Sequence, residues 1–159
     1  MAEKAHDGGA EKSCAQSPHA GRFKPLADAL AARDEMNDVL RNRIDKACAL
    51  LDAEQHLYPN TFRKDTHVGD ILKEYSALDE AALAEVGKVF RLAGRMTSLR
   101  SFGKVTFIKL QDATDAMQVF VARDELGQEA YQLFKKFDIG DLVGVEGDLF
   151  RTKTGELTV

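Results

Sequence analysis

Basic side chains gather between Val86 and Gln111, a stretch that contains no acidic residue. The chain as a whole carries a formal net charge of −4, so this stretch is a local basic stripe on an acidic protein. Lysine and arginine bind phosphate groups, and the stripe therefore predicts contact with nucleic acid, with a solvated strand face as the alternative. The stripe consists of Lys88, Arg91, Arg95, Arg100, Lys104 and Lys109.

One aromatic residue, Phe107, stands inside this stripe in a segment of alternating apolar residues, 104–111. Alternation predicts a strand whose apolar side chains face a core, while Phe107 and Lys109 share the opposite, wet face. An aromatic ring on such a face is a surface on which a nucleic-acid base can stack. The alternative is that Phe107 pairs with Phe120 on a neighbouring strand.

A second side chain suited to base recognition is Gln118. A hairpin centred near Asp112 and Ala113 would place Gln118 opposite Phe107 on the same face of the sheet. The glutamine amide offers both a donor and acceptors to a base edge, although an ordinary solvated polar residue is the alternative.

The elements that position these side chains follow from hydrophobic spacing. A turn is expected at 98–104 and a basic loop at 151–155. Three strands, a helix and two more strands form the order of an OB fold, a five-stranded Greek-key barrel, within a mostly β (α+β) chain with flanking helices. We predict helices over 34–52, 68–85 (one or two) and 125–137, and strands over 90–97, 104–111, 116–123, 142–150 and 156–159.

The chain divides into three predicted segments. Residues 1–32 contain few large apolar side chains and are expected to form a disordered tail or leader. Residues 33–85 are expected to form a helical N-terminal extension, and residues 86–159 the OB-fold domain, truncated within its fifth strand.

Other classes of protein find little support in the sequence. It has no apolar run long enough for a membrane helix and no secretory signal, so we expect a cytoplasmic protein without a membrane partner. The two cysteines and four histidines lack metal-ligand spacing, so no metal site is expected. No nucleophile–base set or glycine-rich phosphate loop indicates an enzyme acting alone.

Six segments together resemble the bacterial-type class II lysyl-tRNA synthetase (lysine–tRNA ligase) family. The resemblance extends from about Arg41 to Val159, and the first 32 residues do not share it. The segments are YPNTFRKD at 58–65, LAGRM at 92–96, GKVTFIKLQD at 103–112, VFVARDEL at 119–126, FKKFDIGDLVGVEGDLF at 134–150 and RTKTGEL at 151–157.

The resemblance implies an anticodon-binding domain whose partner is the anticodon loop of tRNA-Lys, with uridine as the central base. By matching positions it implies that Phe107 stacks on a base, that Gln118 and Glu156 read bases, and that Arg100 is a basic contact. The positions of four further basic residues, in the stripe and in the 151–155 loop, predict additional contacts with the RNA. These are Arg95, Lys109, Arg151 and Lys153.

The family attaches lysine to tRNA in a separate catalytic domain that binds ATP and magnesium. Nothing in this sequence matches the motifs of that domain, so we expect this chain to bind no cofactor and to be inactive alone. The resemblance also implies a homodimer for the full-length protein. Two other functions stay open: a generic single-strand-binding OB-fold protein, and a structural or dimerisation module.

Overall fold

A computed structural model describes residues 37–52 and 57–159 of the chain. The chain divides into two compact units, Met1–Pro59 and Asn60–Val159, which are described separately. The predicted tail at 1–32 lies outside the described residues, as do the first three residues of the helix expected at 34–52.

The described part of the first unit contains one long helix, α2 (Asp38–Asp52). The side chain of Asn37 accepts a hydrogen bond from the Leu40 amide at 3.0 Å, which satisfies one of the unpaired donors at a helix start. Ile44, Cys48 and Leu51 are buried and recur at helical spacing, and the predicted helix is confirmed over Asp38–Asp52.

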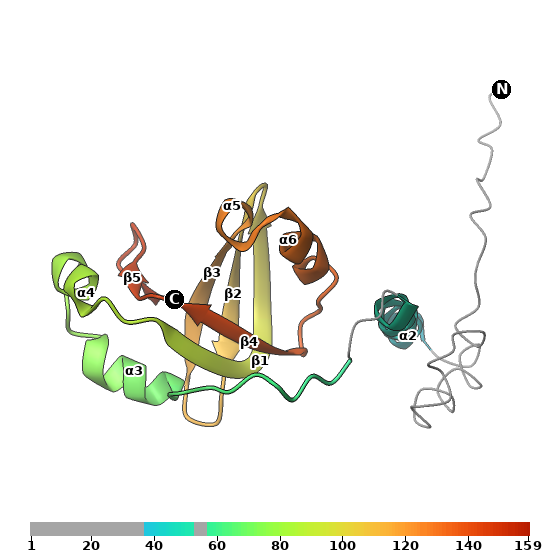
Figure 1. Ribbon diagram of the computed structural model, residues 1–159, viewed down its shortest axis with the longest axis horizontal. Coiled ribbons are helices and arrows are strands. Elements are labelled where there is room, and N and C mark those ends of the chain that lie inside the picture. Colours follow the sequence, from blue (N-terminus) through green and yellow to red (C-terminus); the bar gives the residue numbers. More distant parts are fainter. Residues whose placement is uncertain (1–36, 53–56) are drawn as a thin grey trace. The chain divides into compact units, whose positions relative to one another are not determined.

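The second unit is built on one mixed sheet of six strands, curled into a half-barrel with short helices around it (Figure 1). The strand order is β4-β1-β2-β3-β6-β5, and all pairs are antiparallel except β3 with β6. The strands are β1 (Phe90–Phe102), β2 (Val105–Gln111), β3 (Ala116–Ala122), β4 (Leu142–Gly147), β5 (Phe150–Arg151) and β6 (Leu157–Thr158). The helices are α3 (Val68–Tyr75), α4 (Glu80–Val86), α5 (Arg123–Leu126) and α6 (Gln128–Phe134).

Strand β1 continues five residues beyond the predicted end of the first strand. The expected turn at 98–104 is wrong, because the chain turns only at Gly103, where φ is +62°, and Lys104. A β-bulge between Met96 and Ser98 adds one residue to β1, so the inward-facing positions change parity along the strand. This interruption of the period-two pattern made a continuous strand resemble a turn.

The β2–β3 hairpin holds the register on which the site depends. Phe107 pairs with Phe120, and Gln118 pairs with Lys109, so the expected opposition of Phe107 and Gln118 is wrong by two residues. The pairing starts at Gln111 and Ala116, which leaves four residues in the connection and moves the hairpin centre. A shift of two residues keeps every side chain on its predicted face.

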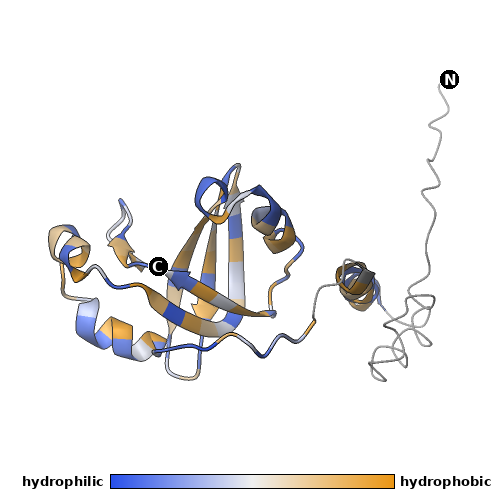
Figure 2. Ribbon diagram, in the orientation of Figure 1, coloured by the Kyte–Doolittle hydropathy of each residue, from blue (hydrophilic) through white to orange (hydrophobic). Residues whose placement is uncertain are grey.

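The sheet's inner side and three helices enclose the core. Val68 and Ile71 of α3 and Leu83 of α4 join the same cluster as the strand residues. The predicted domain boundary at residue 86 stays a prediction, whereas the compact unit with this core begins at Asn60. In Figure 2 apolar and polar positions alternate along the strands. The buried strand residues include Phe90, Leu92, Met96, Ile108, Leu110, Met117 and Val119.

Two predicted elements are divided in the structure. The helix expected at 125–137 is split by Gly127, whose φ of 86° and ψ of 154° are not helical, into α5 and α6. The strand expected at 142–150 is split at residues 148–149 because β4 pairs with β1 while β5 pairs with β6. This division gives six strands instead of the predicted five, and the Greek-key connection stays a prediction. Among the described residues, no helix has the length and apolar character needed to cross a membrane.

Candidate nucleic-acid interface

Side chains of β1, β2 and β3 that point away from the core lie in four rows across the sheet, and we call this surface the outer face. One row, at the tip of the β1–β2 hairpin, contains Phe102, Val105 and Ala122. Neighbouring rows are two residues apart along β2, which corresponds to about 7 Å. The aromatic row contains Arg100, Phe107 and Phe120; the polar row contains Ser98, Lys109 and Gln118; the fourth row contains Arg95, Gln111 and Ala116.

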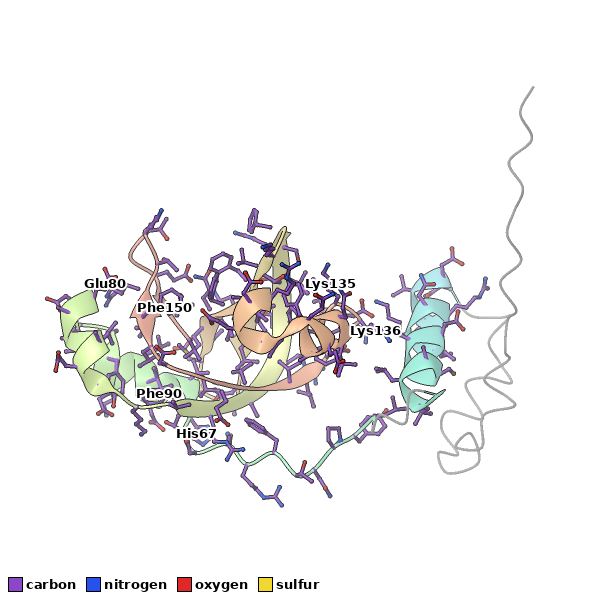
Figure 3. All side chains as sticks on the ribbon, turned by 45° about the horizontal axis from the view of Figure 1, so that its top comes forward. His67, Glu80, Phe90, Lys135, Lys136 and Phe150 are labelled. Carbon is purple, nitrogen blue, oxygen red and sulfur yellow. The ribbon has the colours of Figure 1, made fainter. Side chains whose placement is uncertain are left out.

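The aromatic row is part of a chain of four phenylalanine rings. Phe107 lies 5.2 Å from Phe120 and 6.3 Å from Phe102, measured between ring centroids, and Phe120 lies 5.7 Å from Phe150. Phe150 comes from β5 (Figure 3). Phe107 is half-buried, and Phe102 at the tip of the β1–β2 hairpin is 62% exposed. The pairing with Phe120 that the sequence left as an alternative is therefore present, and the pair lies on the outer face, where it holds Phe107 in place.

Arg100 is directly opposite Phe107 on β1 and is exposed. It is the cross-strand neighbour of the ring that could carry a base, so its guanidinium is suited to bind the phosphate beside that base. The structure thus brings Arg100 and Phe107 together on adjacent strands, although the sequence placed Arg100 in a turn.

The polar row places a constrained glutamine beside an exposed lysine. Gln118 Nε2 donates a hydrogen bond to Thr158 Oγ1 at 3.0 Å, and that hydroxyl donates to the Glu156 carbonyl at 3.2 Å. Thr158 is fully buried, so it is a fixed partner that limits the rotation of the Gln118 amide. A glutamine amide has two N–H donors and one carbonyl, and this bond uses one donor. Lys109 pairs with Gln118 across the hairpin and is exposed.

The loop between β5 and β6 carries three of the predicted contacts. Glu156 is exposed one residue before β6, and its backbone is anchored because its amide donates to Thr152 Oγ1 at 3.1 Å. Thr152 also donates its own amide to the Glu156 carbonyl at 3.0 Å. Lys153 is exposed in the turn.

Arg151 is positioned differently from the other predicted contacts. Its Nε donates to the Leu78 carbonyl at 2.8 Å, and its two terminal nitrogens donate to the carbonyls of Ser76 and Gly155. The guanidinium therefore ties the α3–α4 connection to the β5–β6 loop. Its predicted contact with RNA phosphate stays a prediction. The hydrogen bonds of Arg151 show that it holds two loops of the domain together.

Arg95 lies at the far end of the outer face from the aromatic row. Its guanidinium donates to the Gly140 carbonyl at 2.6 Å, and the residue is exposed. Arg95 and Lys64 both border a hollow of about 480 Å³. Sequence patterns did not indicate Lys64 because it precedes the sheet by many residues and has no strand neighbours of its own.

Asp112 secures the hairpin that carries Phe107 and Gln118. Its Oδ1 accepts hydrogen bonds from the Thr114 amide and hydroxyl at 2.7 and 2.6 Å, as turn chemistry leads one to expect. Its Oδ2 accepts from the Val68 amide at 3.1 Å, at the start of α3. This second task, 44 residues away in sequence, was not visible in the pattern.

The described residues contain no group of three or more histidine, cysteine or acidic side chains able to hold a metal ion. The groups that the outer face and the β5–β6 loop offer to a ligand are aromatic rings, cations, an oriented amide and a carboxylate. Such a set suits the reversible binding of a single nucleic-acid strand.

Comparison with known proteins gives two results. Residues 90–159 match the tRNA anticodon family model, described as an OB-fold nucleic acid binding domain. Lysine–tRNA ligase of Aeromonas hydrophila is 44% identical over 126 residues, covering 79% of this chain and 24% of that protein. Lysine–tRNA ligase of Coxiella burnetii is 43% identical over 106 residues, covering 67% of this chain and 21% of that protein. That of Bordetella parapertussis is 42% identical over 102 residues, with coverages of 64% and 20%. The chain thus spans about a quarter of the length of these relatives.

Proposed function

Because residues 90–159 match the tRNA anticodon family of OB-fold nucleic acid binding domains and the chain is similar to lysine–tRNA ligases, we propose that it binds the anticodon loop of a lysine tRNA. The observation that carries the proposal is the position of Phe107. Its ring lies on the outer face beside Arg100 and one row away from Gln118. A base stacked on this ring would have a cation next to its phosphate and an amide next to its edge.

Stacking by itself accepts any base, so selectivity must come from hydrogen bonds. Uridine presents a donor at N3 and two carbonyl acceptors. Gln118 retains one amide donor and its carbonyl, after its bond to Thr158, and the carboxylate of Glu156 accepts from a donor such as N3–H. Cytidine lacks N3–H and has an amino group in place of one carbonyl, so a partner would stay unpaired at a cost of about 1–3 kcal/mol.

Cations around this centre supply affinity without sequence preference. Arg100 and Lys109 are exposed on the outer face, and Lys153 is exposed in the β5–β6 loop. We assign these three residues to the RNA backbone. We assign Arg95 to the same task at the other end of the face.

The test is to measure dissociation constants for two RNA stem-loops. One carries a lysine anticodon, and the other is identical except for cytidine at the central anticodon position. We expect the uridine loop to bind about ten-fold more tightly, from the unpaired-group cost given above. Phe107→Ala should weaken binding to both loops, and Gln118→Ala should reduce the discrimination more than the affinity. Tyr58→Ala, which removes another aromatic side chain, 78% exposed and outside the sheet, is the control.

Equal affinities for the two loops would favour a generic single-strand-binding module. A Phe107→Ala variant that binds as well as the parent would remove the outer face from recognition and favour a structural or dimerisation module.

For the whole protein we propose lysine–tRNA ligase activity, with the full-length protein acting as a homodimer. ATP and magnesium would then be bound by a part of the relatives that this chain does not match, and this chain would supply recognition alone. Lysine-dependent pyrophosphate exchange should accordingly be absent with the purified 159-residue chain. Exchange catalysed by this chain would contradict the division of tasks.

A further inference from the structure

The fourth row of the outer face opens into a hollow that none of the roles assigned above explains. Its volume is about 480 Å³. It lies where β1 and β4 meet the β2–β3 hairpin and the segment that precedes α3. It is bordered by Lys64, Ala93, Gly94, Arg95, Gln111, Asp112, Ala113 and Leu142.

Charge around the hollow favours an anion. Lys64 and Arg95 bring two cations, and Asp112 is the single carboxylate of the lining. That carboxylate is already engaged, since its two oxygens accept hydrogen bonds from Thr114 and Val68. Arg95 is held by the Gly140 carbonyl, which fixes the cation at the border of the hollow.

The remaining lining suits a flat, partly apolar group. Leu142 on β4 is paired with Arg95 on β1 and is 73% exposed, so its side chain offers an apolar surface to the hollow. Ala93 is two residue pairs farther along the same two strands and adds a second, smaller apolar surface. Gln111, opposite Arg95, is exposed and has an amide suited to a base edge. Two cations, an apolar wall and an amide together match the parts of a nucleotide.

The position of the hollow relates it to the proposed stacking site. Gln111 is four residues from Phe107 on the same face of β2, or about 14 Å along the strand. The polar row with Lys109 and Gln118 lies between them. A strand of RNA that places one base on Phe107 and the next over the polar row would bring a third nucleotide to the hollow.

We propose that the hollow is a nucleotide subsite for the loop nucleotide two positions from the one stacked on Phe107. Lys64 and Arg95 bind its phosphate, and Leu142 packs against its base. This inference rests on the proposed function and adds Lys64 and Leu142, which lie outside the predicted set of RNA contacts.

The test uses the 159-residue chain, the lysine anticodon stem-loop and matched pairs of variants. Leu142→Ala should weaken binding on the order of five-fold, as expected for losing part of one apolar contact. Lys64→Met should weaken binding and lower the slope of log affinity against log salt concentration by about 0.7, the value of one phosphate contact on a single strand. The controls are Leu126→Ala, 45% exposed on α5, and Lys136→Met, exposed just after α6 (Figure 3). Both controls should bind as the parent does.

A scan of stem-loops with one abasic nucleotide at each loop position assigns the subsite. The cost of Phe107→Ala should vanish at one abasic position, and the cost of Leu142→Ala should vanish two nucleotides away. If Phe107→Ala weakens binding while Leu142→Ala and Lys64→Met match the parent, the hollow is not a subsite and the proposed function stands. If all three variants match the parent, the proposed function falls as well.

Discussion

Replacing Asp112 with asparagine should destabilise the second compact unit, because this carboxylate joins the β2–β3 hairpin to the start of α3. Its side chain is only 4% exposed. Oδ1 accepts from the amide and hydroxyl of Thr114 and from the amide of Asp115 at 3.2 Å. Oδ2 accepts from the Val68 amide at 3.1 Å and lies 3.2 Å from His67 Nδ1. Asparagine retains one oxygen for Thr114 but directs an N–H group towards the Val68 N–H.

The size of the effect follows from these contacts. A hydrogen bond to a charged group contributes about 1.5–3 kcal/mol, and a buried amide left without an acceptor costs about 1–3 kcal/mol. The three bonds to Oδ1 survive in a weaker, uncharged form, whereas the bond to Val68 is lost. We therefore expect the free energy of unfolding to fall by about 3 kcal/mol. In a domain of about 100 residues this lowers Tm by roughly 10–20 °C.

The effect should depend on pH in a defined direction. Burial by itself would raise the pKa of the Asp112 carboxyl, but hydrogen bonds from Thr114, Val68 and Asp115 outweigh burial and hold this pKa well below its usual range. The unfolded-state pKa of an aspartate is about 3.9. Ionised Asp112 thus stabilises the fold above about pH 4, and this contribution is lost as the pH falls through the folded-state pKa.

Thermal unfolding followed by circular dichroism between pH 7 and pH 2.5 would measure both quantities for the parent and for Asp112→Asn. The difference in stability should be constant above about pH 5 and should shrink below about pH 4. Asp148→Asn, at an exposed position between β4 and β5, controls for the loss of one negative charge. A Tm within about 2 °C of the parent at pH 7, against the roughly 10–20 °C expected, would refute the reasoning, as would a stability difference that does not change with pH.

Three other substitutions test the outer face and its support. Arg100→Glu should lower RNA affinity and reduce the salt slope by at least about 0.7, and an unchanged slope would remove Arg100 from the interface. Thr158→Val should release the Gln118 amide, because the glutamine loses a neutral hydrogen bond of about 1 kcal/mol. The ratio of the affinities for the uridine and cytidine loops should then fall about three-fold. An unchanged ratio in this variant would show that Gln118 needs no fixed partner. Arg151→Lys should lower Tm by several degrees through the lost bond to Leu78 while leaving the salt slope unchanged, and a lower slope would place Arg151 on the RNA.

Local alternation in the sequence was sufficient to separate the two faces of the sheet. Ile108 and Leu110 are buried as predicted, and Phe107 lies on the opposite face with Lys109. This success survived a wrong hairpin register, because the error was a shift of two residues and two is the period at which side chains return to the same face. The face of Phe107 was therefore predictable when its partner was not.

Features that depend on distant pairing were not predictable in the same way. The bulge after Met96 and the break at residues 148–149 arise where a strand changes its neighbour or its parity, and neither leaves a distinctive residue type. Gly127 did carry a signal, since glycine adopts the positive φ found there without strain. The position of Arg151 left no such signal in the sequence, because the Leu78 and Ser76 carbonyls that it binds are 73 and 75 residues away.

The proposed base selectivity and the stability of this domain both depend on the short strand β6. Its Thr158 is the fixed partner of the Gln118 side chain. The next residue, Val159, donates its amide to the backbone carbonyl of Gln118 at 3.2 Å, and its own backbone carbonyl accepts from the Phe120 amide at 2.7 Å. The parallel contact of β6 with β3 therefore extends the sheet and orients the amide proposed to read the base. Loosening β6 would free Gln118 before it disturbed Phe107, which is held by neighbouring rings on β1 and β3. Discrimination between bases should then be lost under milder conditions than affinity for RNA.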